Sequence, residues 1–345
     1  MSPALAACER FAAAETPAIQ IPPLKSVAPF AFGTAAQVAN IDDTAWRELA
    51  LTQVSQLTPE WEMKMEYILA DGLDRPRFDR PDRIADWARD NAMALHGHTL
   101  IWYSQGAEAF RGLDNAAFDR AFDGYIATVA GRYRGKVRSW DVVNEPILDD
   151  GSGLRDCHWS QRYGQDGYIL RAFEKAREAD PDAILFLNEY NLEGIPRKGA
   201  TFMRLVERLL KAGCPLQGIG TQSHLWIDIE DGAIARSIGE LAQFGLPIHV
   251  SELDVTLRTD KGPLDFRSQS ERLAMQTARV TELAEAFMAL PAAQRFAFTA
   301  WGLRDTDSWY RKDAKDDGKD KPLPFDENGL PNPMAAALAA AFGRG

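Results

Sequence analysis

Two glutamates each stand at the end of a short apolar run, where a carboxylate can act on a bound molecule. Glu145 lies in SWDVVNEPILDD, between an apolar run and a proline, and Glu252 lies in HVSELDV. A single glutamate after a strand is more often a solvated loop residue than a catalyst. Two carboxylates that face each other across a cleft, however, suit the cleavage of a glycosidic bond. One must be protonated to donate to the leaving oxygen, and the other ionised to attack the sugar or activate water.

Other polar side chains in similar places could tune these two groups. His224 and Asp254 could hydrogen-bond Glu252 and hold it charged. Asn144 directly precedes Glu145 and could reach a sugar hydroxyl beside the reacting carbon. Whether these side chains meet in one site depends on the strands and helices that carry them.

Short apolar runs alternate with amphipathic helical patterns along the chain. The runs are nearly continuous in apolar character, as in buried parallel strands with both faces covered. Helical stripes lie between them, such as the apolar positions within 202–210, which stop at Gly213. The eight runs are Pro29–Gly33, Val54–Thr58, Ala94–Trp102, Val137–Val143, Ile184–Asn188, Leu216–Gln222, Pro247–Leu253 and Phe296–Trp301.

This alternation predicts an α/β fold, a single-domain (β/α)8 TIM barrel. An open, doubly wound sheet has the same alternation, but neither GxGxxG nor GxxxxGK[ST] follows the first run. In a barrel, the carboxyl ends of the strands form the active site, so we expect Glu145 and Glu252 on opposite sides of the barrel mouth. The other polar or aromatic residues near the ends of the runs are Glu60, Glu62, Lys64, His98, Trp102, Gln105, Trp140, Asn144, Asn188, Glu189, Tyr190, Asn191, Gln222, His224, Asp254, Trp301, Asp305 and Trp309.

Composition limits the class of protein. The chain has 345 residues, of which 46% are hydrophobic, and a net charge of −11. Nucleic-acid binding needs clustered lysine and arginine, so this acidic balance argues against it.

The three cysteines form no CxxC pair and the five histidines form no HExxH motif, so their spacing indicates no zinc, redox or metalloprotease site. Cys157 and Cys214 could pair in an oxidising compartment, and the sequence leaves that open. The chain contains no run of about 18 apolar residues, so the sequence predicts no membrane span.

The first 23 residues differ from the rest. We expect residues 1–23 to form an N-terminal segment, either a flexible tail or the remnant of a trimmed export signal. The stretch Leu5–Cys8, LAAC, resembles the end of a lipoprotein signal, although the stretch before it is too short to act as one. A chance match in an alanine-rich segment is the alternative. We favour the export signal, which predicts a secreted or periplasmic protein, while a cytoplasmic location stays open.

Seven stretches resemble the signatures of one enzyme family. GHTLIW, WDVVNEP, GIGTQSHL, HVSELDV and AWGLRDTDSW occur in the family's order, with LTPEWEMKM before them and PLPFDENGLPNP after them. The chain therefore resembles glycoside hydrolase family 10, the retaining endo-1,4-β-xylanases, over roughly residues 24–340. NEP alone occurs across related barrel glycosidases, whereas all seven stretches in order form a specific match. The resemblance implies a catalytic barrel over residues 24–345, no metal or organic cofactor, and xylan or a xylo-oligosaccharide as the substrate.

The resemblance also implies roles for individual residues. Glu145 matches the acid/base, Glu252 the nucleophile, and Asn144 the contact to the 2-hydroxyl of the nucleophile-side sugar. His224 and Asp254 match the pair that orients the nucleophile. A retaining mechanism needs the two carboxyl groups about 5–5.5 Å apart. Positions that match sugar-binding residues are Glu60, Lys64, His98, Trp102, Gln105, Gln222, Trp301 and Trp309, and we add Trp61 and Tyr190 as candidate substrate contacts.

Two positions depart from the family pattern. Trp61 stands where the family usually has an asparagine that binds a distal glycone sugar, and tryptophan offers only one N–H donor in place of an amide. Tyr103 stands where the family usually has histidine. We hypothesise that Trp61 shortens the glycone side or makes it more apolar, which would favour short or decorated oligosaccharides.

Two other functions remain as alternatives. One is a related retaining barrel glycosidase that acts on another β-glycan, a short decorated oligosaccharide or an aryl glycoside. The other is a carbohydrate-binding protein without catalysis, which the intact pair of Glu145 and Glu252 argues against. We expect a monomer without a nucleic-acid partner.

Overall fold

Eight parallel strands form a closed sheet in the computed structural model, which describes residues 19–259, 265–312 and 316–344. Each strand hydrogen-bonds to the next, and β10 pairs with both β9 and β1, which closes the circle. The predicted TIM barrel is therefore confirmed, and the open doubly wound sheet is wrong. The barrel strands are β1 (Ala31–Ala36), β2 (Gln56–Pro59), β3 (Ala94–Gly97), β5 (Ser139–Asn144), β6 (Ile184–Glu189), β7 (Gly218–Thr221), β9 (Ile248–Thr256) and β10 (Arg295–Ala300).

Two short strands extend the sheet at its carboxyl ends. β4 (Ile101–Trp102) pairs with β5, and β8 (His224–Trp226) pairs with β9. Their register sets Trp102 beside Asn144 and His224 beside Asp254. These extensions explain why β9 runs past Leu253, where the sequence pattern ended it: residues 254–256 pair with β8.

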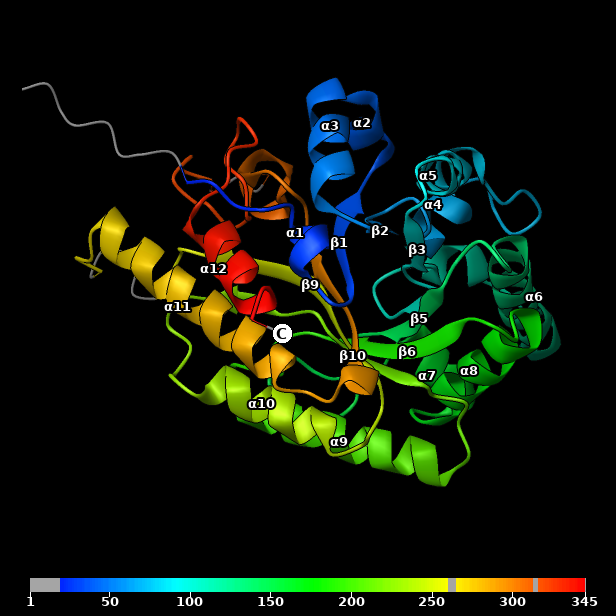
Figure 1. Cartoon of the computed structure of the whole chain (residues 1–345). Helices are drawn as coiled ribbons and strands as arrows, with labels where there is room; N and C mark the ends of the chain where they lie inside the picture. The colour runs from blue at the N-terminus through cyan, green and yellow to red at the C-terminus, as the bar shows by residue number, and fades with distance from the viewer. Residues whose placement is uncertain (1–18, 260–264, 313–315, 345) are drawn as a thin grey trace, which may run out of the picture.

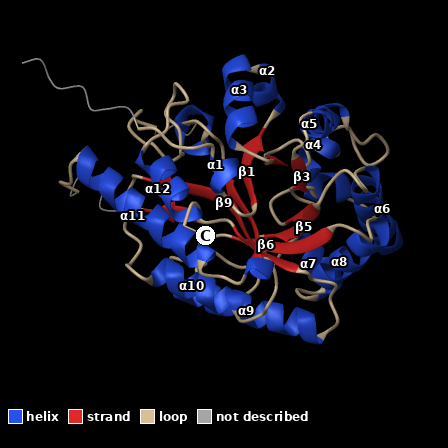
Figure 2. Ribbon diagram, viewed as in Figure 1, coloured by secondary structure: helices blue, strands red, loops and turns tan. Residues whose placement is uncertain are grey.

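Helices surround the strands, as Figure 2 shows with the strands in red at the centre. Figure 1 shows α9, α10 and α11 along one side of the barrel and α6 and α8 along another. The longer helices are α3 (Thr44–Gln53), α5 (Asp79–Asp90), α6 (Asn115–Arg132), α8 (Gly167–Ala179), α9 (Pro196–Lys211), α10 (Ala233–Ala242), α11 (Gln269–Met288) and α12 (Pro333–Phe342). The short ones are α1 (Leu24–Val27), α2 (Val38–Asp42), α4 (Met65–Ile68) and α7 (His158–Tyr163).

The helices bury the apolar stripes that the sequence predicts. In α9, Phe202 and Leu205 are fully buried, and the chain leaves the helix at Gly213, whose φ of +79° costs glycine little. α11 begins with a capping box, in which Ser268 and Glu271 each accept a hydrogen bond from the other's backbone N–H. Burial of these stripes against the strands stabilises the barrel and fixes the strand ends that carry the polar residues.

Inside the barrel, glycine makes room for large side chains. A Cβ atom at Gly97 would lie 2.2 Å from the ring of Trp140, which is fully buried. Trp140 is therefore a core residue, although it belongs to the stretch that carries Glu145. Asp305, another strand-end residue, is also buried and accepts a hydrogen bond from the backbone N–H of Leu323.

Three further expectations concern the N-terminal stretch, the cysteines and membrane spans. The N-terminal stretch Leu5–Cys8 lies outside the described residues. Cys157 and Cys214 are both free and buried. Among the described residues, no helix combines the length and apolar character needed to cross a membrane.

Candidate active site

A cavity of about 370 Å³ lies among the carboxyl ends of the barrel strands. Sequence reasoning singled out every residue that lines it, which shows how well the barrel geometry locates the site. Trp61, Gln105 and Asp254, three other candidates, are not among the lining residues. The lining residues are Glu60, Lys64, His98, Trp102, Asn144, Glu145, Tyr190, Gln222, His224, Glu252, Trp301 and Trp309.

Glu252 lies within β9 and is only 4% exposed. One carboxylate oxygen accepts a hydrogen bond of 2.7 Å from Nδ2 of Asn188. The other lies 3.3 Å from Nε2 of His224, and Nδ1 of His98 is 4.0 Å from the first. Its carboxylate is therefore held from several sides while it faces the cavity.

The charges around Glu252 keep it ionised. Burial by itself raises the pKa of the Glu252 carboxyl, but His98, His224 and Lys64 outweigh it and hold the pKa below its usual value. His224 contributes because its Nδ1 lies 2.9 Å from Asp254. Burial opposes the charge of His224, yet Asp254 and Glu252 together raise its pKa to about 10. The imidazolium thus stays charged beside the carboxylate at neutral pH.

Glu145 follows β5 and has a different setting. One of its carboxylate oxygens accepts a hydrogen bond of 2.7 Å from Nε1 of Trp102. The other accepts bonds of 3.0 Å from Nδ2 of Asn144 and 2.9 Å from Nε2 of Gln222. All three donors are neutral, and the side chain is partly exposed to the cavity. A carboxyl group held by neutral donors can exchange a proton without losing a salt bridge.

A pair of amides links the two carboxylates. Nδ2 of Asn188 donates both to Glu252 and, at 2.9 Å, to Oδ1 of Asn144. Nδ2 of Asn144 in turn donates to Glu145. Ser251 donates to Oδ1 of Asn188 at 2.7 Å and so fixes which way this amide points. The two glutamates therefore face one cavity, connected through Asn144 and Asn188. Sequence reasoning placed Asn188 at a strand end but gave it no role.

Aromatic rings and one lysine form the walls of the cavity. Trp301 packs edge-to-face on His98, with ring centroids 5.2 Å apart. Trp309 is 43% exposed and donates its Nε1–H to Asp254 at 2.9 Å. Lys64 lies over the ring of Trp102, 4.8 Å from its centroid. Flat rings beside polar groups suit a sugar, which has apolar C–H faces and hydroxyl edges.

Trp61 and Gln105 lie together beside the cavity. Both side chains donate to Oε2 of Glu66, Trp61 at 3.1 Å and Gln105 at 3.0 Å. The ring of Trp61 also packs edge-to-face on Tyr67, with centroids 5.1 Å apart. These two residues form a wall next to the site, and the single N–H donor of Trp61 is bonded to Glu66.

Asp141 contacts His98, which lines the cavity, from within the barrel, and sequence reasoning missed it. It is fully buried, and its Oδ2 lies 2.8 Å from Nδ1 of His98 and 2.9 Å from Nε2 of His96. A charged residue inside an otherwise apolar run was the available signal. Among the described residues, one group could hold a metal ion by proximity, namely His98, Asp141 and Glu252, whose ligand atoms lie within 4.8 Å of one another.

A second cavity, of about 650 Å³, shares Tyr190, His224 and Trp309 with the first. Its other walls include Trp226 and Tyr310, and Tyr310 stacks on Trp309 with ring centroids 4.0 Å apart. The two cavities together form one partly aromatic surface. This surface is longer than a single sugar would need.

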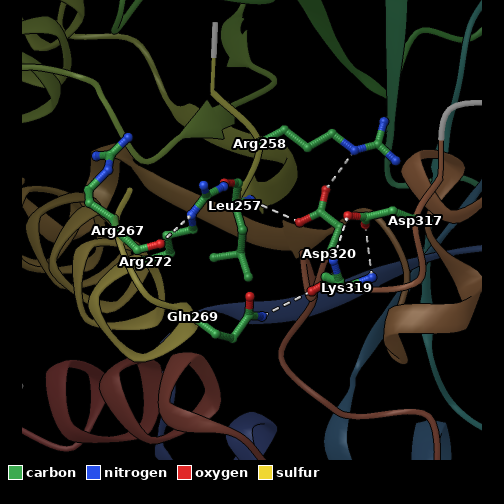
Figure 3. A pocket seen from close by; sticks show the side chains of 8 residues that line it. All are labelled: Leu257, Arg258, Arg267, Gln269, Arg272, Asp317, Lys319 and Asp320. Atoms are coloured by element: carbon green, nitrogen blue, oxygen red, sulfur yellow. Dashed lines mark hydrogen bonds and ion pairs between the residues drawn. The ribbon is translucent and has the colours of Figure 1, made fainter. Parts of the chain in front are cut away.

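A third cavity, of about 340 Å³, is lined mostly by charged side chains, some of which are paired with one another (Figure 3). Arg267 and Arg272 both contact Asp265, and Arg258 lies 3.4 Å from Asp320. It shares no lining residue with the cavity around the two glutamates. Its lining residues are Leu257, Arg258, Arg267, Gln269, Arg272, Asp317, Lys319 and Asp320.

Comparison with known proteins gives one consistent result. The sequence profile of Glycosyl hydrolase family 10 matches residues 24–341. Endo-1,4-beta-xylanase A of Cellvibrio japonicus is 33% identical over 92% of this chain, which spans only 56% of that relative's length. Among solved structures, a thermostable mutant of xylanase Xyn10A from Cellvibrio japonicus has a TM-score of 0.84, at 30% identity over 93% of this chain and 100% of that one. A mutant of xylanase A from P fluorescens subsp. cellulosa, in complex with xylopentaose, has a TM-score of 0.83, at 30% identity over 92% of this chain and 99% of that one.

Proposed function

The chain belongs to glycosyl hydrolase family 10, and we propose that it is a retaining glycosidase that cleaves β-1,4-xylosidic bonds in xylan or xylo-oligosaccharides. One observation carries the proposal: Glu145 and Glu252 face the same cavity in different environments and are joined through two amides. This matches what a double displacement needs, an ionised nucleophile and a carboxyl group that can transfer a proton.

The first step breaks the glycosidic bond. Glu252 attacks the anomeric carbon through a carboxylate oxygen, while Glu145 gives its proton to the leaving oxygen. The positive charge of His224 and the hydrogen bond from Asn188 keep Glu252 ionised and correctly turned. The products are a departed sugar chain and a glycosyl ester on Glu252.

The second step releases the bound sugar. Glu145, now deprotonated, accepts a proton from water as the water attacks the anomeric carbon from the side that the leaving group left. The ester bond to Glu252 breaks and returns it as a carboxylate. Two inversions give net retention of the β configuration. Asn144 lies between the two carboxyl groups and is placed to donate to the hydroxyl next to the reacting carbon once the amide turns from Glu145.

Three lines support a xylose-based substrate. Relatives at about one-third identity are named endo-1,4-beta-xylanases, and a similar structure is in complex with xylopentaose. The cavity offers tryptophan rings with lysine, amide and carboxylate groups, which suit an uncharged sugar. The adjoining cavity around Tyr190, Trp226 and Trp309 gives room for further sugars of the same chain.

A product profile on defined xylo-oligosaccharides tests this function. We expect internal cleavage of xylopentaose and xylohexaose, with the newly formed reducing end in the β configuration when observed by proton NMR. Parallel assays on xylan, cellulose, aryl xylosides and aryl cellobiosides separate xylanase activity from the alternative glycosidases. Faster turnover of a cellulose-derived substrate would contradict the proposed substrate. Sugar binding without turnover of any substrate would instead support the non-catalytic alternative.

Trp61 provides a test of chain-length preference in the same assay. We expect Trp61→Asn to raise activity on long unsubstituted xylan by about 2- to 10-fold, because an amide offers both a donor and an acceptor to a distal sugar. Trp61→Phe removes the hydrogen bond to Glu66 without adding an amide, and serves as the matched control. An unchanged profile for Trp61→Asn would refute the idea that this residue limits the glycone side.

A further inference from the structure

The backbone at Glu145 has an unusual conformation for a residue that must aim a proton. Its φ is +56°, in the left-handed region that is strained for a non-glycine residue. The N–H of Glu145 donates to the carbonyl of Asn188 at 2.9 Å, which secures one side of the residue. Such a conformation persists only where neighbouring groups hold it, so the partner of the Glu145 carbonyl matters equally.

Arg155 is that partner. Its Nε donates to the backbone carbonyl of Glu145 at 3.0 Å, and its own backbone N–H donates to the carbonyl of Pro146 at 2.8 Å. The residue is only 8% exposed. A short antiparallel bridge between Ile147 and Leu154 folds the loop back so that Arg155 returns beneath Glu145. The loop that begins at Glu145 is thus closed by a side chain ten residues further along the chain.

The guanidinium of Arg155 is itself braced on several sides. It lies over the ring of Tyr103, 4.0 Å from the centroid. Its Nη2 donates to the hydroxyl of Tyr190 at 2.7 Å and also bonds Asp149. Tyr103 is one of the two positions at which this chain departs from the family pattern, and Tyr190 lines the cavity. Burial raises the pKa of the Tyr103 phenol, so the ring stays neutral beneath the cation.

We propose that Arg155, stacked on Tyr103, is a positioning residue that holds the backbone of Glu145 and thereby aims its carboxyl group at the leaving oxygen. Arg155 does not line the cavity, so its effect on proton transfer passes through Glu145. The inference rests on the proposed function, because it assigns proton transfer to Glu145. Proton transfer needs heavy atoms about 2.6–3.2 Å apart, so a small rotation of this backbone weakens it.

The test compares two substrates that differ in their need for an acid. Phenyl β-xylobioside has a poor leaving group that must be protonated, whereas the leaving group of 2,4-dinitrophenyl β-xylobioside departs without a proton. Arg155→Lys keeps the charge but loses the planar, forked donors and the stacking surface. We expect it to lower kcat/KM for the phenyl substrate by about 10- to 100-fold, and for the dinitrophenyl substrate by less than about 3-fold.

Arg279→Lys is the matched control. Arg279 is likewise buried, at 6% exposure, donates to a backbone carbonyl, that of Ile229, and pairs with an exposed carboxylate, Asp231. It lies on α11 away from the cavity, so its replacement should leave the ratio of the two kcat/KM values unchanged. Equal losses on both substrates in Arg155→Lys, or a ratio equal to that of Arg279→Lys, would overturn the proposal.

A second variant keeps the test valid if Arg155→Lys does not fold. Tyr103→Leu removes the ring under the guanidinium but leaves every hydrogen bond of Arg155 available. The same selective loss on the phenyl substrate is expected, at about 3- to 10-fold, and an unchanged ratio in the folded variant would overturn the proposal. Failure of the wild-type protein to cleave either xylobioside would instead contradict the proposed function, so the two failures are distinguishable.

Discussion

The two glutamates of the cavity sit in contrasting surroundings. Glu252 lies within a strand, almost fully buried, beside His224, with His98 and Lys64 near its charge. Glu145 lies just past a strand in a left-handed conformation, partly exposed, with neutral donors on its carboxylate. The carboxylate of Glu252 therefore faces a charged partner directly, whereas the carboxylate of Glu145 is bonded by neutral donors.

This contrast shows how one barrel can give two identical side chains different tasks. A carboxylate that must attack benefits from cations that keep it ionised, and rigid strand geometry fixes its direction. A carboxyl group that must give and regain a proton benefits from neutral partners and from a path to water. The difference comes from the environment, so replacing one residue at a time should reveal it.

The largest effect is expected from Glu252→Ala. Without a nucleophile no glycosyl-enzyme forms, so turnover should fall by more than about 10⁴-fold while xylo-oligosaccharide binding persists. Isothermal titration with xylopentaose and initial rates on an aryl xylobioside measure the two quantities. Added azide should enter the vacated space and give the α-glycosyl azide by one inversion. Retained activity would refute Glu252 as the nucleophile.

Glu145→Ala should have a smaller effect that depends on the substrate. Loss of proton transfer should lower kcat/KM by about 10²- to 10⁴-fold for phenyl β-xylobioside and by much less for the dinitrophenyl substrate. Here azide should attack the glycosyl-enzyme and give the β-glycosyl azide, the opposite anomer from Glu252→Ala. Proton NMR of the azide products reads both cases. The same anomer from both variants would remove the distinction between the two residues.

The strands and the lining of the cavity could be predicted from the sequence because both depend on local pattern. Strands buried on both faces are continuously apolar, and barrel geometry sends the residues after them to one mouth. The role of Asn188 could not be predicted, because it follows from lateral register: β5 and β6 align Asn144 with Asn188. Arg155 lies in a loop with no periodic pattern, and only the folded loop brings it beneath Glu145.

Trp61 illustrates a different limit. The sequence shows that the usual amide is missing at this position, but it does not show where the indole goes. That direction depends on Glu66 and Tyr67, which bind and pack against Trp61 beside the cavity. The wall formed with Gln105 therefore emerges only from tertiary contacts.

The smallest effect tests the electrostatic half of the comparison. His224 lowers the pKa of Glu252, and its own pKa of about 10 keeps it charged across the working range. His224→Gln keeps a donor but removes the charge, so the pKa of Glu252 should rise and the acid limb of the kcat/KM profile should move to higher pH. At neutral pH the loss in kcat/KM should be about 10-fold or less, because Glu252 remains largely ionised there.

His249→Gln serves as the control. It replaces a different, buried histidine, one that bonds Thr299, and should leave the acid limb in place. If both variants had the wild-type acid limb, the charge of His224 would not be what keeps Glu252 ionised, and the contrast would rest on hydrogen bonding and backbone geometry alone.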